Sequence, residues 1–230
     1  WIPVRVCVVR TGEHRQRTID TVRGMSDQPM SGPSLMWEQR YADAHYVFGT
    51  EPNDFLRAQL QVLPRGRVLC LAEGEGRNAV FLAEAGFEVH SIDLTEAGVA
   101  KTLQLAADRG VTVHARVGDL AATHIGLGEW NAIVSIFAHM PPPVRRDLHR
   151  RVVAALAPDG VLLLEAYTPD QVGRGTGGPH DPALTMTLAG LRDELELLEF
   201  VHAVEMVRDV VEGVGHTGPG AVVQVLARKR

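Results

Sequence analysis

The fold is decided by one stretch, Val68-Leu69-Cys70-Leu71-Ala72-Glu73-Gly74-Glu75-Gly76-Arg77-Asn78, in which an apolar run breaks into glycines just before a helical pattern begins. A short apolar run bounded by turn residues is typical of a strand buried on both faces. Glycines after it let the backbone approach a ligand, and the free amides of the next helix attract an anion. The stretch therefore predicts a strand, a ligand-binding turn and a helix over 78–85. By itself the glycine pattern also fits a tight turn that binds nothing.

The same order of strand and helix repeats along the chain. Helices are expected over 78–85, over 95–109 and after Pro143, where Arg145, Arg146, Arg150 and Arg151 are predicted to face solvent. The first five strands are expected over 67–72, 87–92, 111–117, 132–137 and 160–166. Alternation of this kind predicts an α/β fold, a mainly parallel sheet with helices on both faces.

The C-terminal part follows a different pattern. Two β-rich runs, 200–211 and 221–227, are joined by a glycine-rich segment over 212–220. Two neighbouring strands joined in this way run antiparallel. The whole pattern predicts a Rossmann-like sheet of seven strands that ends in an antiparallel strand pair.

Composition limits the classes of function. The chain has 230 residues, 45% of them hydrophobic and 22% charged, which suits one well-buried domain. A net charge of −5 offers no basic field for nucleic acid or for an anionic membrane, so a small-molecule partner is expected. Two cysteines support neither a disulfide framework nor a zinc site, and no metal is expected. No run reaches the roughly 20 apolar residues of a membrane span, which favours a cytoplasmic location.

The N-terminal segment has a composition of its own. Residues 1–24 carry five arginines against Glu13 and Asp20, a local charge of +3. Residues 25–35 are rich in Ser, Pro, Gly and Met. We expect residues 1–35 to be a flexible extension without an assigned function, and residues 36–230 to form the domain.

Acidic residues after two further strands indicate the ligand. Asp93 ends the second strand roughly 20 residues after the glycines, where a carboxylate can accept ribose hydroxyls. Asp119 follows the third strand, where its carboxylate can accept from an adenine amino group and the amide of Leu120 can reach a ring nitrogen. Dinucleotide enzymes and methyltransferases share the acid after the second strand. Ala79 stands in place of the third glycine of the dinucleotide motif, a replacement that is tolerated there.

With these motifs the sequence resembles the class I, Rossmann-like S-adenosylmethionine-dependent methyltransferases, and among them the group related to tellurite-resistance and thiopurine methyltransferases. The resemblance covers residues 37–230. It implies S-adenosylmethionine as the cofactor, with its methionine part at the glycine turn. The residues implied to bind the cofactor are Glu73, Gly74, Gly76, Asp93, Leu94, Asp119 and Leu120. One departure is Cys70, which stands where many relatives carry an acid.

Aromatic residues and one histidine complete the candidate site. Trp37 opens a run that resembles the cofactor-covering segment of that group, and its ring can shield a sulfonium by cation–π attraction; a packed helix across the sheet edge is the alternative. Phe137 and His139 follow the fourth strand, at the edge where α/β sheets bind ligands. Phe137 is expected to line the cofactor pocket. His139 is the candidate catalytic residue, although a lone histidine is more often structural.

The long connection after the fifth strand is the candidate acceptor-binding segment. Tyr167 and Arg174 lie in it, and loops of this length commonly act as lids or binding loops. In the family that the sequence resembles, this connection borders the acceptor site. A surface loop without a ligand is the alternative.

The predicted activity is transfer of a methyl group from S-adenosylmethionine to a small acceptor by in-line displacement. Thiols, metalloid oxyanions and natural-product nucleophiles all fit as acceptors. An NAD(P)-dependent oxidoreductase is the competing enzyme class, although the Tyr-x-x-x-Lys pair that would support it does not occur in the sequence. A non-catalytic protein that binds S-adenosylmethionine is the third reading.

Overall fold

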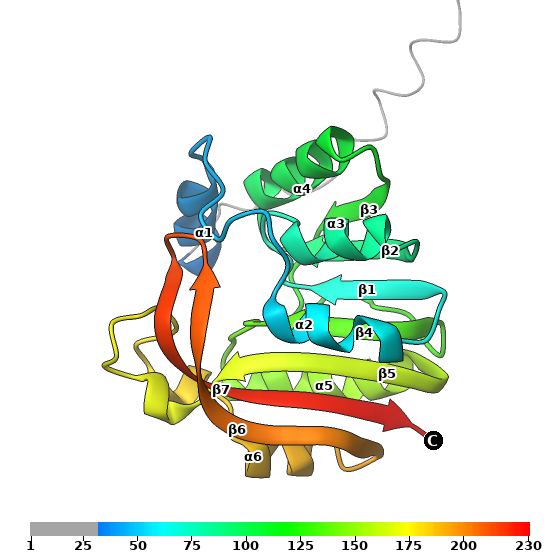
Figure 1. Cartoon of the computed structure of the whole chain (residues 1–230). Helices are drawn as coiled ribbons and strands as arrows, with labels where there is room; N and C mark the ends of the chain where they lie inside the picture. The colour runs from blue at the N-terminus through cyan, green and yellow to red at the C-terminus, as the bar shows by residue number, and fades with distance from the viewer. Residues whose placement is uncertain (1–31) are drawn as a thin grey trace, which may run out of the picture. The chain divides into compact units, whose positions relative to one another are not determined.

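One sheet organises the part of the chain that the computed structural model describes, residues 32–230. Its strand order is β3-β2-β1-β4-β5-β7-β6 (Figure 1). The strands are β1 Arg67–Leu71, β2 Glu88–Asp93, β3 Val113–Val117, β4 Trp130–Ile136, β5 Leu156–Tyr167, β6 Leu198–Glu212 and β7 His216–Lys229. The α-helices are α1 Pro33–Tyr41, α2 Asp54–Gln59, α3 Arg77–Glu84, α4 Glu96–Asp108, α5 Pro142–Ala155 and α6 Leu188–Glu194.

The direction of the strands confirms the predicted fold class. Strands β1 to β5 pair in parallel, and β7 pairs antiparallel with both β5 and β6. Strand β7 is therefore the one strand of this sheet that runs against the others. The expected connection over 212–220 is wrong, because pairing continues to Glu212 and His216 and leaves only residues 213–215 to join the two strands. Backbone hydrogen bonding extends the two strands into the segment 212–220, although its glycines are typical of a loop.

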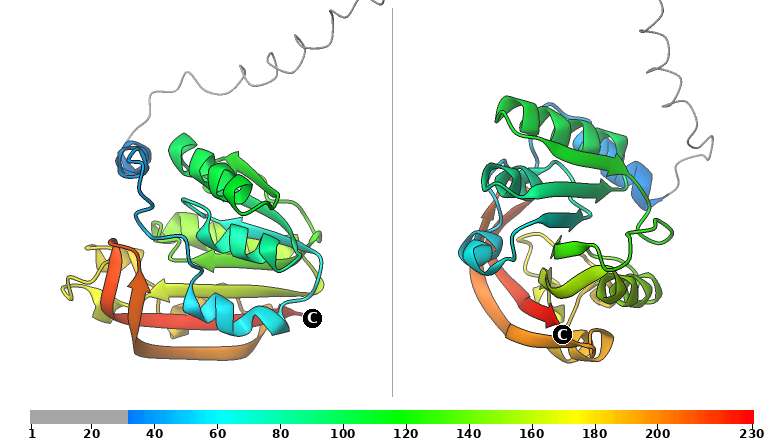
Figure 2. Two further views of the ribbon diagram at one scale, coloured as in Figure 1. Left: turned by 45° about the horizontal axis from the view of Figure 1, so that its top comes forward. Right: turned by 90° about the vertical axis from the view of Figure 1, so that its right-hand side faces the viewer.

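Alternating residues of the strands build a core on each face of the sheet. Val68 and Cys70 of β1 face the side covered by α2, α3 and α4, whereas Leu69 and Leu71 face the side covered by α5 and α6. Figure 2 shows these helices on opposite sides of the sheet. Both faces are covered, as the apolar strands predicted.

Several elements differ from the sequence expectation. As expected, no helix lies between β3 and β4, which are joined by residues 118–129, whereas other elements depart from the prediction. Helices α2 and α6 were not anticipated, and α1 was anticipated only as the packed-helix alternative for the run that begins at Trp37. Arg145 was expected in solvent and is buried, because its guanidinium forms a two-point contact with Glu194 of α6. Residues 1–31 lie outside the described part of the chain, and α1 begins at Pro33, before the predicted domain boundary.

The carboxyl ends of β1 and β4 form a topological switch point. From β1 the chain continues toward β2 and β3 on one side, and from β4 it continues toward β5 on the other. Open α/β sheets bind ligands at such a point. Ala72 and Phe137 directly follow these two strands, and both adopt left-handed backbone conformations with φ of 48° and 54°. Such backbone strain in residues other than glycine concentrates at functional sites.

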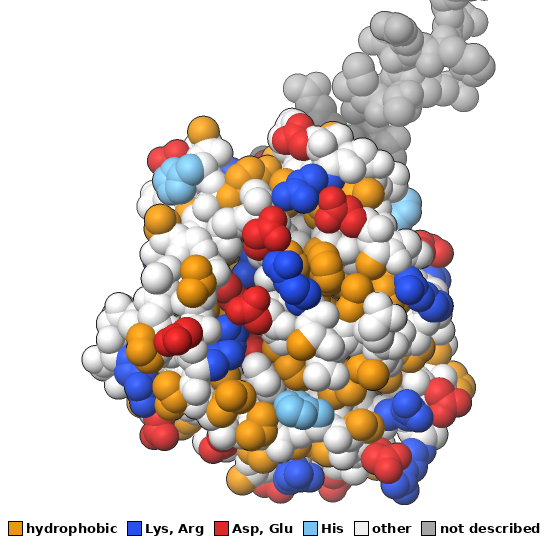
Figure 3. Space-filling model, viewed as in Figure 1, with side chains coloured by type: hydrophobic (Ala, Val, Ile, Leu, Met, Phe, Trp, Pro, Cys, Tyr) orange, Lys and Arg blue, Asp and Glu red, His pale blue; other side chains and the backbone are white. Residues whose placement is uncertain are grey.

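No helix within residues 32–230 combines the length and the apolar composition that crossing a membrane requires. On the face shown in Figure 3, acidic and basic side chains are interspersed, and no large area carries charge of one sign.

Candidate active site

The glycine turn between β1 and α3 is held tightly by its neighbours. Gly74 and Gly76 have φ of 66° and 95°, which favours glycine. The Gly74 amide donates to Oδ2 of Asp93 at 2.7 Å, and the Thr102 hydroxyl donates to the Gly74 carbonyl at 3.0 Å. A Cβ on Gly76 would lie 2.7 Å from Cα of Thr102, so only glycine fits at that position.

Glu73 caps helix α3 from within the turn. Its Oε1 accepts from the amides of Asn78 and Ala79 at 2.9 and 2.8 Å. These are the amides where the sequence suggested an anionic ligand, so the chain itself supplies an acceptor for them. Burial raises the pKa of Glu73 to about 7, although the two amide hydrogen bonds act in the opposite direction. The contact of Glu73 with the methionine part of the cofactor stays a prediction.

Asp93 lies at the carboxyl end of β2 and is buried. Its Oδ1 accepts from the amide and the hydroxyl of Thr95 at 3.0 and 2.7 Å, while Oδ2 accepts from Gly74. A carboxylate has about four acceptor positions. About one position therefore stays open on Oδ2, enough for one ribose hydroxyl rather than two. Leu94 beside it is half-buried.

Asp119 and Leu120 follow β3 on the same edge of the sheet. The Asp119 side chain is exposed, and its Oδ1 accepts from the Ala121 amide at 2.8 Å, which leaves Oδ2 without a hydrogen bond from residues 32–230. The Leu120 side chain is buried in the core on the α5 face. Both residues lie after the carboxyl end of β3, and their contact with the adenine stays a prediction.

Seven rings form an aromatic wall along the carboxyl edge. They come from α1, the segment that follows it, and the ends of β4, β5 and β7. The wall consists of Trp37, Tyr41, Phe48, Phe137, His139, Tyr167 and His216.

The wall reaches from α1 to β5 without a break. The Trp37 and Tyr41 rings lie 5.5 Å apart, Phe48 lies 4.6 Å from His216, and Phe137 lies 4.9 Å from His216. Tyr41 also ties the wall to the glycine turn, because a Cβ on Gly74 would lie 2.8 Å from its hydroxyl. The predicted shielding segment and the predicted glycine turn are thus in contact.

His139 is held by both ring nitrogens. Nδ1 lies 3.0 Å from the Leu184 carbonyl, and Nε2 accepts from the Tyr167 amide at 3.3 Å. This pattern assigns the proton to Nδ1. Burial lowers the pKa of His139 to about 4, so the ring is neutral near pH 7. With both nitrogens engaged, His139 positions the β4 and β5 ends, and a catalytic role for it stays a prediction.

The two predicted acceptor-binding residues lie in different surroundings. Tyr167 is fully buried, and its ring stacks on Phe137 at 4.5 Å within the wall. Arg174 is exposed, and its Nε donates to the carbonyl of Asp170 in its own turn at 2.7 Å. The structure brings Tyr167 to the candidate site and does not bring Arg174 into contact with the wall.

A buried ionic network behind the wall was missed by sequence reasoning. Glu165 of β5 and Glu212 of β6 share Arg208 and Asn53, while Gln224 donates to Glu165 at 2.6 Å. Arg77 of α3 joins the network at Glu212. The available signal was Glu165 itself, because a carboxylate inside an apolar strand requires a partner. Within residues 32–230, no group of three His, Cys, Asp or Glu side chains suits a metal ion.

Comparisons with known proteins agree with this geometry. Residues 68–160 match the family model described as a methyltransferase domain. A curated relative, the protein-L-isoaspartate O-methyltransferase of Salinibacter ruber, is 25% identical over 184 residues, which cover 74% of this chain and 80% of the relative. The segment that the family model matches runs from β1 to the start of β5, and so it includes the glycine turn and Asp93.

Solved structures share the fold at low sequence identity. One, described as concerning the conversion of a disulfide bond into a thioacetal group during echinomycin biosynthesis, has a TM-score of 0.69 at 17% identity and covers 85% of this chain and 92% of that one. TehB from Haemophilus influenzae has a TM-score of 0.64 at 21% identity and covers 77% of this chain and 62% of that one. The solved structures show that the fold is shared, and the match of residues 68–160 to a methyltransferase domain implies S-adenosylmethionine as the cofactor.

Proposed function

We propose that the chain transfers the methyl group of S-adenosylmethionine to a small-molecule acceptor bound against the aromatic wall. The contact between Tyr41 and Gly74 carries this proposal, since it joins the cofactor-binding turn to the wall. The match to a methyltransferase domain supports methyl transfer over the nicotinamide-dependent alternative.

The donor set of the chain fits this cofactor. Asp93 has about one acceptor position open for a ribose hydroxyl. Oδ2 of Asp119 and the amide of Leu120 are assigned to the adenine. Gly74 and Gly76 let the backbone pass close to the methionine part. Phe137, with its left-handed backbone, lies where the methyl group and the acceptor are expected to meet.

The bound cofactor supplies an activated methyl group on a sulfonium. The chain then has to hold donor and acceptor in line and to exclude water, which can account for most of the catalysis. The aromatic faces of Trp37, Tyr41 and Phe48 suit a positively charged sulfonium. A cation–π interaction of this kind contributes about 0.5–2 kcal/mol. Helix α1 is fixed over the site because the Glu38 carboxylate accepts from the amides of Glu96 and Ala97, both at 3.0 Å.

The state of His139 narrows the choice of acceptor. Because both ring nitrogens are engaged, the chain offers no free base at this position. Acceptors that are already nucleophilic near pH 7, such as thiolates and metalloid oxyanions, need less help than hydroxyls. This agrees with a place in the tellurite-resistance and thiopurine group, as does the likeness in fold to TehB.

Calorimetry on the full chain tests the donor site. We expect S-adenosylmethionine to bind at micromolar concentration and NAD not to bind. Asp93→Asn should weaken the binding of S-adenosylmethionine by about tenfold or more, since the substitution removes a charged hydrogen-bond acceptor. Asp108→Asn, at the exposed end of α4, is the matched control and should bind as the wild type does.

Thermal melts of both variants check that the fold is retained. Binding of NAD in place of S-adenosylmethionine would overturn the proposal. Turnover is then measured by mass spectrometry with small aliphatic and aromatic thiols. Binding without methylation of any acceptor in a broad panel would favour a non-catalytic cofactor-binding protein.

A further inference from the structure

Three buried polar atoms at the wall have no hydrogen-bond partner among residues 32–230. They are Nη1 of Arg77, the hydroxyl oxygen of Tyr167 and Nδ1 of His216. Arg77 is 7% exposed and Tyr167 is fully buried. Buried polar groups in folded proteins are nearly always paired, so several orphans in one region call for an explanation.

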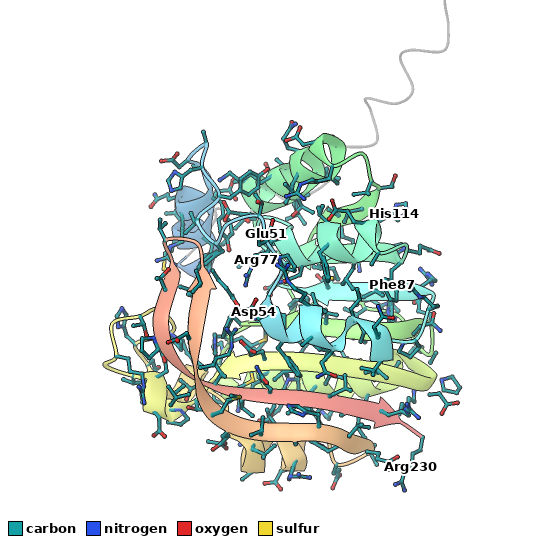
Figure 4. The ribbon with its side chains drawn as sticks, viewed as in Figure 1. Glu51, Asp54, Arg77, Phe87, His114 and Arg230 are labelled. Carbon is teal, nitrogen blue, oxygen red and sulfur yellow. The ribbon has the colours of Figure 1, made fainter. Side chains whose placement is uncertain are left out.

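The three atoms belong to neighbouring side chains. His216 pairs across the β6–β7 hairpin with Glu212, and Glu212 accepts from Nη2 of Arg77. The Tyr167 and His216 rings are perpendicular with centroids 5.3 Å apart, and Phe137 contacts both. In Figure 4, Arg77 lies between the start of α3 and the β6–β7 hairpin. The three unpaired atoms thus belong to side chains that lie together at the carboxyl edge of the sheet, beside Phe137 of the aromatic wall.

The ionic network pairs its charges but leaves one hydrogen-bonding group of Arg77 unused. Arg77 and Arg208 stand against Glu165 and Glu212, two cations against two anions, all with side chains at most 11% exposed. Nη2 of Arg77 is used by Glu212, whereas Nη1 still has hydrogen-bond donors to offer. A guanidinium is suited to a second planar oxygen pair.

We propose that the methyl acceptor carries a carboxylate, which Nη1 of Arg77, the Tyr167 hydroxyl and Nδ1 of His216 bind while Phe48 and Phe137 pack against its apolar body. This inference rests on the proposed function and adds the class of acceptor. The number of donors suits a carboxylate, because its two oxygens have about four acceptor positions between them. A neutral imidazole can present Nδ1–H as a donor, and burial lowers the pKa of His216 to about 3, which keeps it neutral.

Benzoate and benzamide, which differ in charge but hardly in shape, are the probes. Each is titrated by calorimetry into the full chain, with and without saturating S-adenosylhomocysteine. We expect benzoate to bind about tenfold or more tightly than benzamide, as a charge-assisted hydrogen bond requires. Arg77→Lys keeps an ion pair with Glu212 but removes the unpaired nitrogen, and it should bring the ratio of the benzoate and benzamide affinities close to one. Arg150→Lys, with a side chain 77% exposed on α5, is the matched control.

Each outcome decides the proposal. Equal binding of benzoate and benzamide by the wild type overturns it. So does an Arg77→Lys variant that keeps the benzoate preference but loses S-adenosylhomocysteine, because Arg77 would then hold the carboxylate of the cofactor. If Arg77→Lys does not fold, Tyr167→Phe provides the same comparison, with a several-fold loss of benzoate affinity expected. Failure of the wild type to bind S-adenosylhomocysteine counts against the proposed function, and the cofactor-free titration still decides the carboxylate site.

Discussion

Nη2 of Arg77 donates a hydrogen bond to Oε2 of Glu212, and this contact joins the first residue of α3 to the last residue of β6. The two residues are 135 positions apart in the chain. Their side chains are 8% and 2% exposed, so neither charge has an alternative partner in water. The contact fastens the hairpin that carries His216 to the helix that begins at the glycine turn.

Removing one partner of this pair should be costly. Glu212→Ala leaves the charge of Arg77 buried and unpaired, and breaking a buried ion pair in this way costs about 3–5 kcal/mol. Urea unfolding measures the loss. Glu199→Ala is the control, because it removes an exposed carboxylate that lies on β6 like Glu212 and pairs with Arg230, and it should change stability far less. Equal losses in the two variants would contradict a buried network.

Tyr167→Phe should leave the stability of the ligand-free chain unchanged or raise it. The hydroxyl of Tyr167 is buried without a partner in residues 32–230, so its removal relieves a desolvation penalty of about 1–3 kcal/mol instead of breaking a bond. Tyr46→Phe is the matched control, because its hydroxyl donates to the Lys101 carbonyl at 3.2 Å, and its loss should cost about 0.5–1.5 kcal/mol. Thermal unfolding compares the two, and a larger loss for Tyr167→Phe would assign its hydroxyl a structural bond.

Much of the fold could be predicted because local patterns carried it. The glycine turn, the strands β1 to β5 and the helices α3 to α5 follow from apolar runs and glycine punctuation in the sequence. The full length of the β6–β7 hairpin did not, because pairing through Glu212 and His216 depends on backbone contacts rather than on side-chain pattern. Helix α1 could be offered only as one of two alternatives for a similar reason, since Glu38 fixes it against α4 through a contact between residues 58 positions apart.

The candidate site also contains a part that the sequence could predict and a part that it could not. Asp93 and the glycine turn are close in sequence and were expected together. The ionic network joins Asn53, Glu165 and Glu212, which no spacing rule connects, because the sheet topology brings them together. The roles of the predicted site residues stay predictions. Among them, the hydrogen bonds of His139 and the exposure of Arg174 could not be anticipated from residue type.

Acid should weaken the chain through Glu194. Burial opposes ionisation of this carboxyl, but hydrogen bonds from His149 and Arg145 prevail and lower its pKa from 4.5 to about 2. The ionised form is bound more tightly in the folded state, so the stabilisation is complete above pH 4.5 and is lost as the pH falls through about 2.

Glu194→Gln should remove this pH dependence. The wild type should exceed the variant in unfolding free energy by on the order of 3 kcal/mol near neutral pH, and the two should converge toward pH 2. Glu196→Gln, two residues further along and exposed, should parallel the wild type throughout. A constant difference between wild type and Glu194→Gln from pH 7 to pH 2 would exclude Glu194 as the titrating group.

Glu73 should make the folded chain less stable as the pH rises, which is the opposite of the effect of Glu194. Burial raises its pKa from 4.5 to about 7, so between these values the folded chain binds a proton that the unfolded chain has released. Its contribution is therefore greatest below pH 4.5 and is lost as the pH rises through about 7. Glu73→Gln keeps an oxygen for the amides of Asn78 and Ala79 but cannot titrate.

Urea unfolding at several pH values isolates this effect as the difference between wild type and variant. That difference should shift against the wild type by on the order of 2–3 kcal/mol from pH 4.5 to pH 7, whereas Glu84→Gln, at the exposed end of α3, should show no such shift. S-adenosylmethionine sharpens the test, because a ligand at the glycine turn that favours ionised Glu73 must release a proton on binding. Calorimetry in buffers of different ionisation enthalpy measures that proton, and its absence near pH 7 would remove Glu73 from the cofactor site.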